Sequence, residues 1–482
     1  MRTCLILVGL ALGTPLSGAR AAAPEARFGG FGEYRVDASV PCLTDEQRAE
    51  IQARISAGIR TLRAENLLPP PAAQAVSFDW PVRLKAGLGD PGFHGISNFV
   101  DHDPGYPNAV QDYMCGTRTY DLSNGYNHQG TDVFSWPFGW YKMDHDQVEV
   151  VAAAPGTIVS KSDGNYDRDC SFTGSDWNAV YVVHADGSEA WYGHLKSGSL
   201  TPKAAGQTVS RGEYLGIVGS SGNSTGPHLH FEVYDAANHL IDPYAGPCNS
   251  STPTTWWTSE RPYYDSAINA IMTHDAPPVF PACPGEETLN QRTAFTPGET
   301  AYFAVYYRDQ LSGQVSNYAV YDAANALVTR WSHSSPSPFY AASYWYWSLT
   351  LPTNRSNGWW RFQVTYLGTT YQRPFYVGDP TAVAGLPAAA GIRFIGGTPN
   401  PVASGASFEF ELLARERVRL VLLDGEGRRV TTLSNGWFGS GAHHVSWDGR
   451  DAGGRAVAPG LYFARLEADR RAAITRKVVV AR

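Results

Sequence analysis

Residues 228–234 read His-Leu-His-Phe-Glu-Val-Tyr, in which polar and apolar side chains alternate without a break. Successive side chains of a β-strand point to opposite faces of its sheet. The alternation therefore predicts a strand whose apolar side chains face a core, while His228 and His230 face a groove. Glu232, on the same face, could orient either imidazole. By itself the pattern also fits a half-buried edge strand whose histidines meet water.

Two further histidine motifs precede this strand. His128 and Asp132 stand four residues apart, and Gly130 between them lets the backbone bend so that both side chains can reach one ion. His194 follows Trp-Tyr-Gly at a predicted strand end. Together the motifs supply four imidazoles and a carboxylate. A catalytic zinc site needs that inventory: three N or O ligands, an open position for water, and groups that carry protons.

The surrounding chain predicts a mostly β protein. Between residues 91 and 247, short β-rich segments alternate with Gly, Asn and Asp turns, and no helices alternate with them, so we expect an antiparallel sheet. Residues 284–378 and 392–482 have the strand spacing of two β-sandwich domains, separated by an Ala/Gly/Pro linker at 379–391. Only 17% of residues are charged, and the 49 glycines and 32 prolines suit turn-rich extracellular domains.

The N-terminal region predicts export. Residues 1–21 combine a basic start, a short apolar run and small residues before a processing site, as in a signal peptide. No segment is long enough to span a bilayer, so we expect a soluble protein that is secreted, at the cell surface or in the periplasm. Residues 22–90 contain one short helix over 44–63, with Thr44 and Gln47 spaced as a capping box. This segment could be a propeptide, a spacer or a docking helix.

Five of the six cysteines follow the signal peptide, and none forms a Cys-x-x-Cys pair. Disulfides are therefore favoured over thiolate metal binding. We expect Cys115 to pair with Cys170, and Cys248 with Cys283. Cys42 is then left over.

Two alternative functions are weaker. The chain has 38 basic and 45 acidic residues and no basic run, so a nucleic-acid partner is not expected. Residues 222–226 fit the Gly-x-Ser-x-Gly pattern of serine hydrolases, which requires a strand before it and a helix after it. Here Pro227 and the alternating strand follow, so this loop is expected to shape the groove beside His228.

The histidine motifs, together with the stretches 153–158 and 219–232, resemble those of the lysostaphin/LytM-type (beta-lytic) zinc metallopeptidases. The resemblance covers roughly residues 115–245. Some members of this family assist the transition state with a tyrosine, for which Tyr126 and Tyr192 are candidates.

The resemblance implies one Zn²⁺ ion bound by His128, Asp132 and His230, with His194 and His228 as the catalytic pair. A zinc-activated water would attack a peptide bond, and a histidine would serve as general acid and base because the chain has no His-Glu-x-x-His motif. The implied substrate is the peptide part of peptidoglycan or a Gly-rich peptide, cut by endopeptidase action at a cross-link or bridge. A non-catalytic wall-binding or divisome-activator role is the alternative.

The C-terminal unit, residues 392–482, resembles FlgD-like immunoglobulin-type domains and the related sorting domains of type IX secretion. The resemblance rests on residues 399–401, 420–427, 447–449 and 458–463. It implies contact with the cell surface or the secretion machinery, while a plain spacer stays open.

Overall fold

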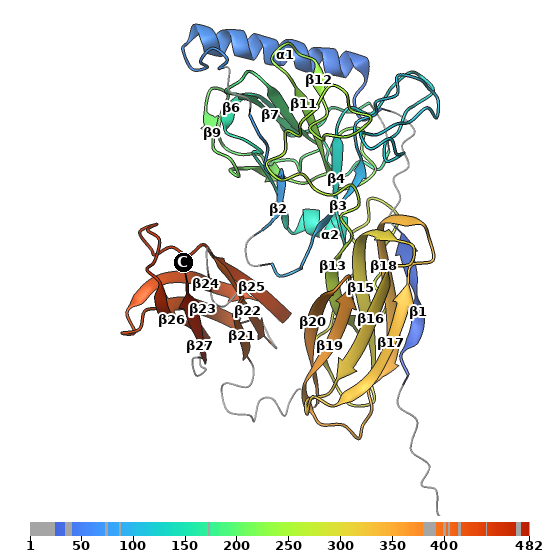
Figure 1. The fold of residues 1–482 in the computed structure, drawn as a ribbon, viewed down its shortest axis with the longest axis vertical. Helices are drawn as coiled ribbons and strands as arrows, with labels where there is room; N and C mark the ends of the chain where they lie inside the picture. Colours follow the sequence, from blue (N-terminus) through green and yellow to red (C-terminus); the bar gives the residue numbers. More distant parts are fainter. Residues whose placement is uncertain are drawn as a thin grey trace, which may run out of the picture.

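The computed structural model describes residues 25–33, 41–72, 76–85, 88–171, 174–378, 392–398, 402, 405–412, 416–439, 441–468 and 474–481. Within these residues the only helices are α1 (Asp45–Ala64) and α2 (Gly139–Asp144), which confirms the mostly β fold class. Neither helix has the length and apolar character needed to cross a membrane. The expected signal peptide, residues 1–21, and the linker, 379–391, lie outside the described residues. Figure 1 shows three β-rich units, with α1 at the edge of the first.

The first unit is built on one large sheet in the order β3-β4-β11-β8-β7-β6-β9, with β12 also paired to β11. A smaller sheet has the order β10-β5-β2. Every pairing within these two sheets is antiparallel, as predicted. The strands are β2 (Val82–Leu84), β3 (His94–Asn98), β4 (Thr131–Ser135), β5 (Val148–Val151), β6 (Gly156–Ser162), β7 (Ala179–His184), β8 (Glu189–Gly193), β9 (Thr208–Val209), β10 (Tyr214–Ile217), β11 (His228–Tyr234) and β12 (Leu240–Ile241).

Strand β11 has the alternation that its sequence predicts. Leu229, Phe231 and Val233 belong to the main hydrophobic core on one face of the sheet. The opposite face carries the polar side chains, and these are also buried, except for partly exposed His228. The half-exposed groove expected from the sequence is therefore covered in this structure.

Helix α1 provides that cover. Its capping box between Thr44 and Gln47 is formed as predicted. Its apolar side chains pack against aromatic residues of β7, β8 and β11. Figure 1 shows β7 and β11 beneath the helix. At Gly58 the helix approaches β6 so closely that an added Cβ would lie 2.6 Å from the Val159 carbonyl oxygen. A glycine in mid-helix costs roughly 0.5–1 kcal/mol relative to alanine, and this close approach explains why one is needed.

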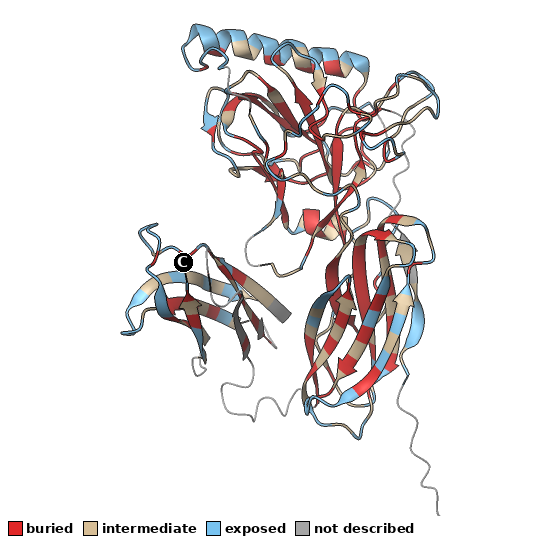
Figure 2. Cartoon of the chain, in the orientation of Figure 1, coloured by how far each residue is buried: buried red, intermediate tan, exposed pale blue. Residues whose placement is uncertain are grey.

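The middle unit is a sandwich of two sheets, in the orders β1-β18-β15-β13 and β14-β20-β19-β16-β17. Its core is rich in tyrosine, tryptophan and phenylalanine, and Figure 2 shows it as buried segments between the layers. Two of its strands, β1 and β13, come from outside residues 284–378. The strands are β1 (Arg27–Glu33), β13 (Ala267–His274), β14 (Ala294–Phe295), β15 (Thr300–Leu311), β16 (Val315–Tyr321), β17 (Leu327–Ser334), β18 (Phe339–Thr350), β19 (Gly358–Tyr366) and β20 (Thr369–Val377).

The C-terminal unit is a second, smaller sandwich. Its sheets have the orders β21-β22-β25 and β24-β23-β26-β27, and all of their pairings are antiparallel. A separate hydrophobic core lies between them. The strands are β21 (Ile392–Thr398), β22 (Ala406–Leu412), β23 (Glu416–Leu423), β24 (Arg429–Phe438), β25 (Gly441–Trp447), β26 (Gly460–Ala468) and β27 (Ile474–Val480).

The disulfide pairing predicted from the sequence is wrong. The structure joins Cys115 to Cys248, with their Cα atoms 5.2 Å apart, and Cys170 to Cys283, with theirs 5.7 Å apart. The Cys248 amide donates a hydrogen bond to the Tyr113 carbonyl oxygen, so the chain after β12 runs beside the loop that holds Cys115. Spacing along the chain could not show this return.

Candidate metal centre

Three adjacent strands bring the predicted site residues together. On β4, Asp132 lies directly opposite His230 of β11. On the other side of β11, His230 lies opposite Gly193, the last residue of β8, so His194 follows at the same edge. His128 lies three residues before Thr131, the first residue of β4, and His228 begins β11. The five residues therefore gather at one end of the sheet.

His128, Asp132 and His230 present one ligand atom each within 4.8 Å of one another. Nε2 of His128 lies 3.0 Å from Oδ2 of Asp132, and Nδ1 of His230 lies 2.8 Å from Oδ1 of the same carboxylate. Two N or O ligands of one tetrahedral zinc ion lie roughly 3.3 Å apart. The three side chains are buried. Their chemistry and spacing therefore fit a zinc ion.

Hydrogen bonds fix the two imidazoles of this group. Nδ1 of His128 donates to the carbonyl oxygen of Phe99 at 2.7 Å, because a carbonyl oxygen can only accept. Nε2 of His230 faces Oε2 of Glu232 at 2.9 Å. Each ring thus has one nitrogen anchored and the other left to face the cluster. A carboxylate or carbonyl behind the histidine is the usual way in which proteins orient a metal ligand.

His194 and His228 form a second pair, with ring centroids 4.3 Å apart. Nδ1 of His194 donates to the Ser221 carbonyl oxygen at 2.6 Å, and Nδ1 of His228 donates to that of Gly226 at 2.8 Å. Nε2 of His194 is buried and has no hydrogen-bond partner among the described residues. Nε2 of His228 lies 3.8 Å from Oδ1 of Asp132. Both rings thus keep a nitrogen available for proton transfer.

Burial and neighbouring charged groups shift the pKa values of the side chains in this cluster. Burial favours the neutral carboxyl, but the His128 imidazole beside it holds the pKa of Asp132 well below its ordinary value. Burial and the neighbouring His228 and His230 rings hold the pKa of His194 well below that of a free histidine. Asp132 is therefore an anionic group that could bind a cation, and His194 is a neutral imidazole that can accept a proton.

Sequence reasoning missed two residues at this centre. Nδ2 of Asn98, on β3, donates to Oδ2 of Asp132 at 2.9 Å and so fixes the carboxylate. Sγ of Cys42, just before α1, lies 3.8 Å from Nδ1 of His230. Cys42, His194 and His230 form a second group whose possible ligand atoms lie within 4.8 Å of one another. The one available signal was the odd cysteine.

The two candidate tyrosines lie on different sides of the sheet. Oη of Tyr126 is 3.1 Å from Sγ of Cys42 and therefore lies beside the centre. The Tyr192 hydroxyl accepts a hydrogen bond from the Ala153 amide within the main core. Only Tyr126 is placed to contact a group bound at the centre.

The serine-hydrolase alternative does not fit the geometry around Ser224. Strand β11 follows the loop, where a nucleophile elbow requires a helix. Oγ of Ser224 lies 3.3 Å from Nδ1 of His228, but this nitrogen donates its hydrogen to Gly226. It cannot take a proton from the serine.

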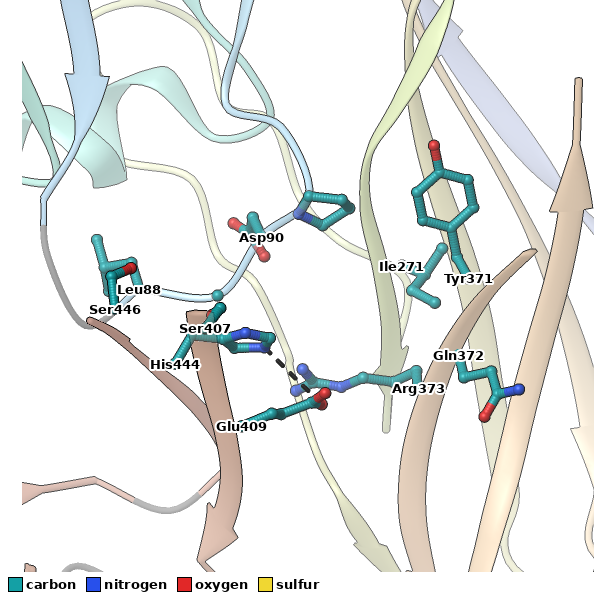
Figure 3. Close-up of a pocket in the computed structure, with 12 residues that line it drawn as sticks. Leu88, Asp90, Ile271, Tyr371, Gln372, Arg373, Ser407, Glu409, His444 and Ser446 are labelled. Atoms are coloured by element: carbon teal, nitrogen blue, oxygen red, sulfur yellow. Dashed lines mark ion pairs between the residues drawn. The ribbon is translucent and has the colours of Figure 1, made fainter. Parts of the chain in front are cut away.

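A separate cavity of about 300 Å³ lies between residues 88–91, the middle sandwich and the C-terminal sandwich (Figure 3). Arg373 projects toward it, and His444 lies 3.8 Å from Glu409 at its wall. Among the described residues, groups of three or more potential metal ligands occur only at the β4-β11 centre. This cavity is therefore not a candidate metal site.

Comparison with known proteins identifies two parts of the chain. Residues 127–243 match the model of Peptidase family M23, and residues 400–472 match that of the FlgD Ig-like domain. These matches confirm both resemblances drawn from the sequence.

The curated relatives match short stretches of the chain. DD-carboxypeptidase/endopeptidase Mpg of Neisseria meningitidis serogroup B is 44% identical over 82 residues, which are 17% of this chain and 18% of the relative. Glycyl-glycine endopeptidase ALE-1 of Staphylococcus capitis is 33% identical over 119 residues, 24% of this chain and 27% of the relative. A zinc containing peptidase from Vibrio cholerae, known from a crystal structure, is 23% identical, with 35% of this chain and 39% of that chain covered and a TM-score of 0.22. The chain thus spans less than a third of the length of these two curated relatives.

Proposed function

We propose that this chain, which carries a peptidase domain of family M23 at residues 127–243, is an exported zinc metalloendopeptidase that cuts peptide bonds in bacterial peptidoglycan. The observation that carries the proposal is the convergence of four oriented imidazoles and one carboxylate at one end of the sheet. The related proteins named as a DD-carboxypeptidase/endopeptidase and a glycyl-glycine endopeptidase support a cross-link or a Gly-rich bridge as the substrate. Two disulfides fit an oxidising compartment outside the cytoplasm.

His128, Asp132 and His230 would hold the ion. When bound, zinc lowers the pKa of a water molecule and polarises a peptide carbonyl. Nε2 of His194 takes the proton of the attacking water and returns it to the departing amine, because this nitrogen carries the free lone pair of a fixed tautomer. As an imidazolium, His228 beside it would donate a hydrogen bond from Nε2 to the oxygen on which negative charge develops, since its Nδ1 hydrogen is held by the Gly226 carbonyl oxygen.

The C-terminal sandwich is proposed to contact the cell surface or the secretion machinery. Its match to the FlgD Ig-like domain supports a binding role separate from catalysis. It has its own hydrophobic core, so it can serve this role without rearranging the peptidase domain.

Digestion of purified sacculi tests the activity. The protein is loaded with zinc and used both intact and cut within residues 65–72, the segment that follows α1 and is exposed except for Leu68. It is incubated with sacculi of several wall types, with and without a chelator. Mass analysis of the muropeptides should show the loss of cross-linked species, and chelator should abolish it. Asp132→Ala, which removes a ligand, is the matched inactive control. Unchanged muropeptides from every wall type would contradict the proposal, and absence of bound zinc would favour the non-catalytic wall-binding role.

A further inference from the structure

A cysteine from the N-terminal segment enters the metal centre. Cys42 is buried, and it is the only described cysteine outside a disulfide. Its Sγ is 3.8 Å from Nδ1 of His230. A sulfur and a nitrogen that share one tetrahedral zinc ion lie about 3.5 Å apart. The thiol thus stands where a fourth ligand would stand.

The centre also contains an unsatisfied group that points to a bound ligand. His194 is fully buried, and its Nε2 has no hydrogen-bond partner among the described residues. A ring nitrogen of His194 lies within 4.8 Å of both Cys42 and His230. A buried polar atom without a partner is costly, so this nitrogen indicates that a ligand binds beside it at the centre.

The chain around Cys42 is held firmly in place. The Pro41 carbonyl oxygen accepts a hydrogen bond from Nδ2 of Asn223 at 2.9 Å. Nε2 of Gln47 donates to the carbonyl oxygens of Gly174 and Ser175, both at 3.2 Å. These contacts come from the loops that border the metal centre, so Cys42 is not placed there by a single chance contact.

Helix α1 continues from Cys42 across the face on which a peptide substrate would lie. Glu232 of β11, Trp191 of β8 and Tyr181 of β7 are neighbours in register on that face. Ile51 and Ile55 of α1 pack into the cluster formed with Trp191 and Tyr181. The helix thus covers the face of the sheet beside the proposed zinc ion. A peptidoglycan strand cannot reach the ion while the helix is docked.

We infer that Cys42 is the fourth ligand of the zinc ion and that residues 41–72, here called the strap, keep the peptidase latent until they are displaced; the inference rests on the function proposed above. The thiol gives up its proton to solvent when it binds the ion. On displacement it takes up a proton, and solvent occupies its place. The Cys42 thiolate and water thus compete for the fourth position on the proposed zinc ion.

The strap has a place where it can be cut. After α1, residues 65–72 are exposed except for Leu68, and Pro69, Pro70 and Pro71 prevent regular secondary structure. Hydrolysis there by an external protease would break the covalent connection between α1 and the catalytic sheet, while β1 would still hold the other end of the segment against β18. Exposed segments of this kind are preferred sites of proteolytic nicking.

X-ray absorption at the zinc edge of the full-length protein tests the ligand. We expect one sulfur at about 2.3 Å and three N or O ligands at about 2.0–2.1 Å. Cys42→Ser should lose the sulfur and keep the zinc, while the control Glu50→Gln, at an exposed position of α1, should keep both. Zinc surrounded by N and O ligands alone in the unmodified chain would overturn the inference and leave the proposed function standing. Absence of zinc would overturn both.

Activity on labelled peptidoglycan tests latency. Cys42→Ser and the chain cut within residues 65–72 should each be more active than the intact chain, on the order of tenfold or more, since a shift of 1.4 kcal/mol in the docking equilibrium produces that factor. Glu50→Gln should match the intact chain. Sulfur at the zinc together with equal activity of the intact, substituted and cut proteins would overturn the inhibitory role.

Discussion

The guanidinium of Arg48, on α1, is ion-paired with the carboxylate of Glu232 on β11, and both side chains are buried. Glu232 also faces Nε2 of His230 at 2.9 Å, and Nη1 of Arg48 donates to Oη of Tyr234 at 3.0 Å. One carboxylate therefore links the covering helix to the imidazole that faces the proposed zinc position. Docking of the strap and orientation of His230, the proposed metal ligand, are coupled through it.

Replacing Arg48 by methionine should destabilise the protein strongly. Removal of one partner from a buried ion pair costs about 3–5 kcal/mol, because the other charge remains buried without compensation. Urea unfolding of the full chain, followed by tryptophan fluorescence, measures the loss. Arg60→Met, at an exposed position of the same helix, should change stability by less than about 0.5 kcal/mol. Equal effects of the two substitutions would show that the Arg48–Glu232 pair contributes nothing.

Local patterns predicted the elements that position the centre. The alternation in β11 gave both its faces, because a strand's side chains have a period of two whatever surrounds it. The capping box predicted the start of α1 to within one residue, because the side chains of Thr44 and Gln47 each accept a hydrogen bond from the other residue's backbone amide. The histidine motifs indicated the residues that the fold brings together, because each motif lies on its own short segment.

Contacts between distant segments could not be predicted in the same way. Strand β1 contains three glycines in seven residues, a composition that disfavours a strand. It pairs with β18 because those glycines admit aromatic rings: an added Cβ at Gly29 would lie 2.2 Å from the Tyr346 ring, and one at Gly32 would lie 2.2 Å from that of Tyr344. The disulfide partners and the contact between Cys42 and His230 likewise depend on which segments, far apart in the sequence, lie side by side in the fold. The spacing of residues along the chain does not show this.

Replacing Asn98 by alanine should weaken zinc binding by about 10- to 100-fold, the usual effect of losing a hydrogen bond to a metal ligand. Asn98 holds Oδ2 of Asp132, and without it the carboxylate is free to rotate. Competition with a zinc-binding dye measures the affinity. Asn357→Ala, at an exposed position in the loop before β19, is the control and should bind zinc normally. Unchanged affinity of the Asn98 variant would show that this residue does not contribute to zinc binding.

Replacing His194 by alanine should lower peptidase activity by about 10²- to 10⁴-fold, the contribution expected of a general acid and base. Zinc content should stay unchanged, because the proposed ligands are other residues. The assay uses the more active of the intact and cut forms, with zinc measured by elemental analysis. His239→Ala, at an exposed position, should keep full activity. Full activity of the His194 variant with zinc bound would refute the assigned role.

His274, on β13, makes the middle sandwich sensitive to acid. The side chain is buried, and its Nδ1 donates to the Leu289 carbonyl oxygen at 2.7 Å. Nε2 lies 3.3 Å from Oη of Tyr306, whose hydroxyl can donate to it only while the imidazole is neutral. Burial lowers the pKa of His274 from 6.5 to about 4. Between these values the unfolded chain binds a proton that the folded chain does not, so the free energy of unfolding falls as the pH falls.

Between pH 7.5 and 4.5 this one group should remove about 2.5 kcal/mol of stability, at 1.36 kcal/mol per unit of pKa difference. Other groups titrate over the same range, so the quantity to compare is the difference between two proteins. In His274→Gln the side chain does not titrate, and the decline in unfolding free energy between the two pH values should be smaller than in the parent chain by about that amount. Stability at pH 7.5 is expected to be lower in the variant, because glutamine does not reproduce both hydrogen bonds. Parallel declines in the two proteins would mean that His274 takes up its proton in the folded state as readily as in the unfolded one.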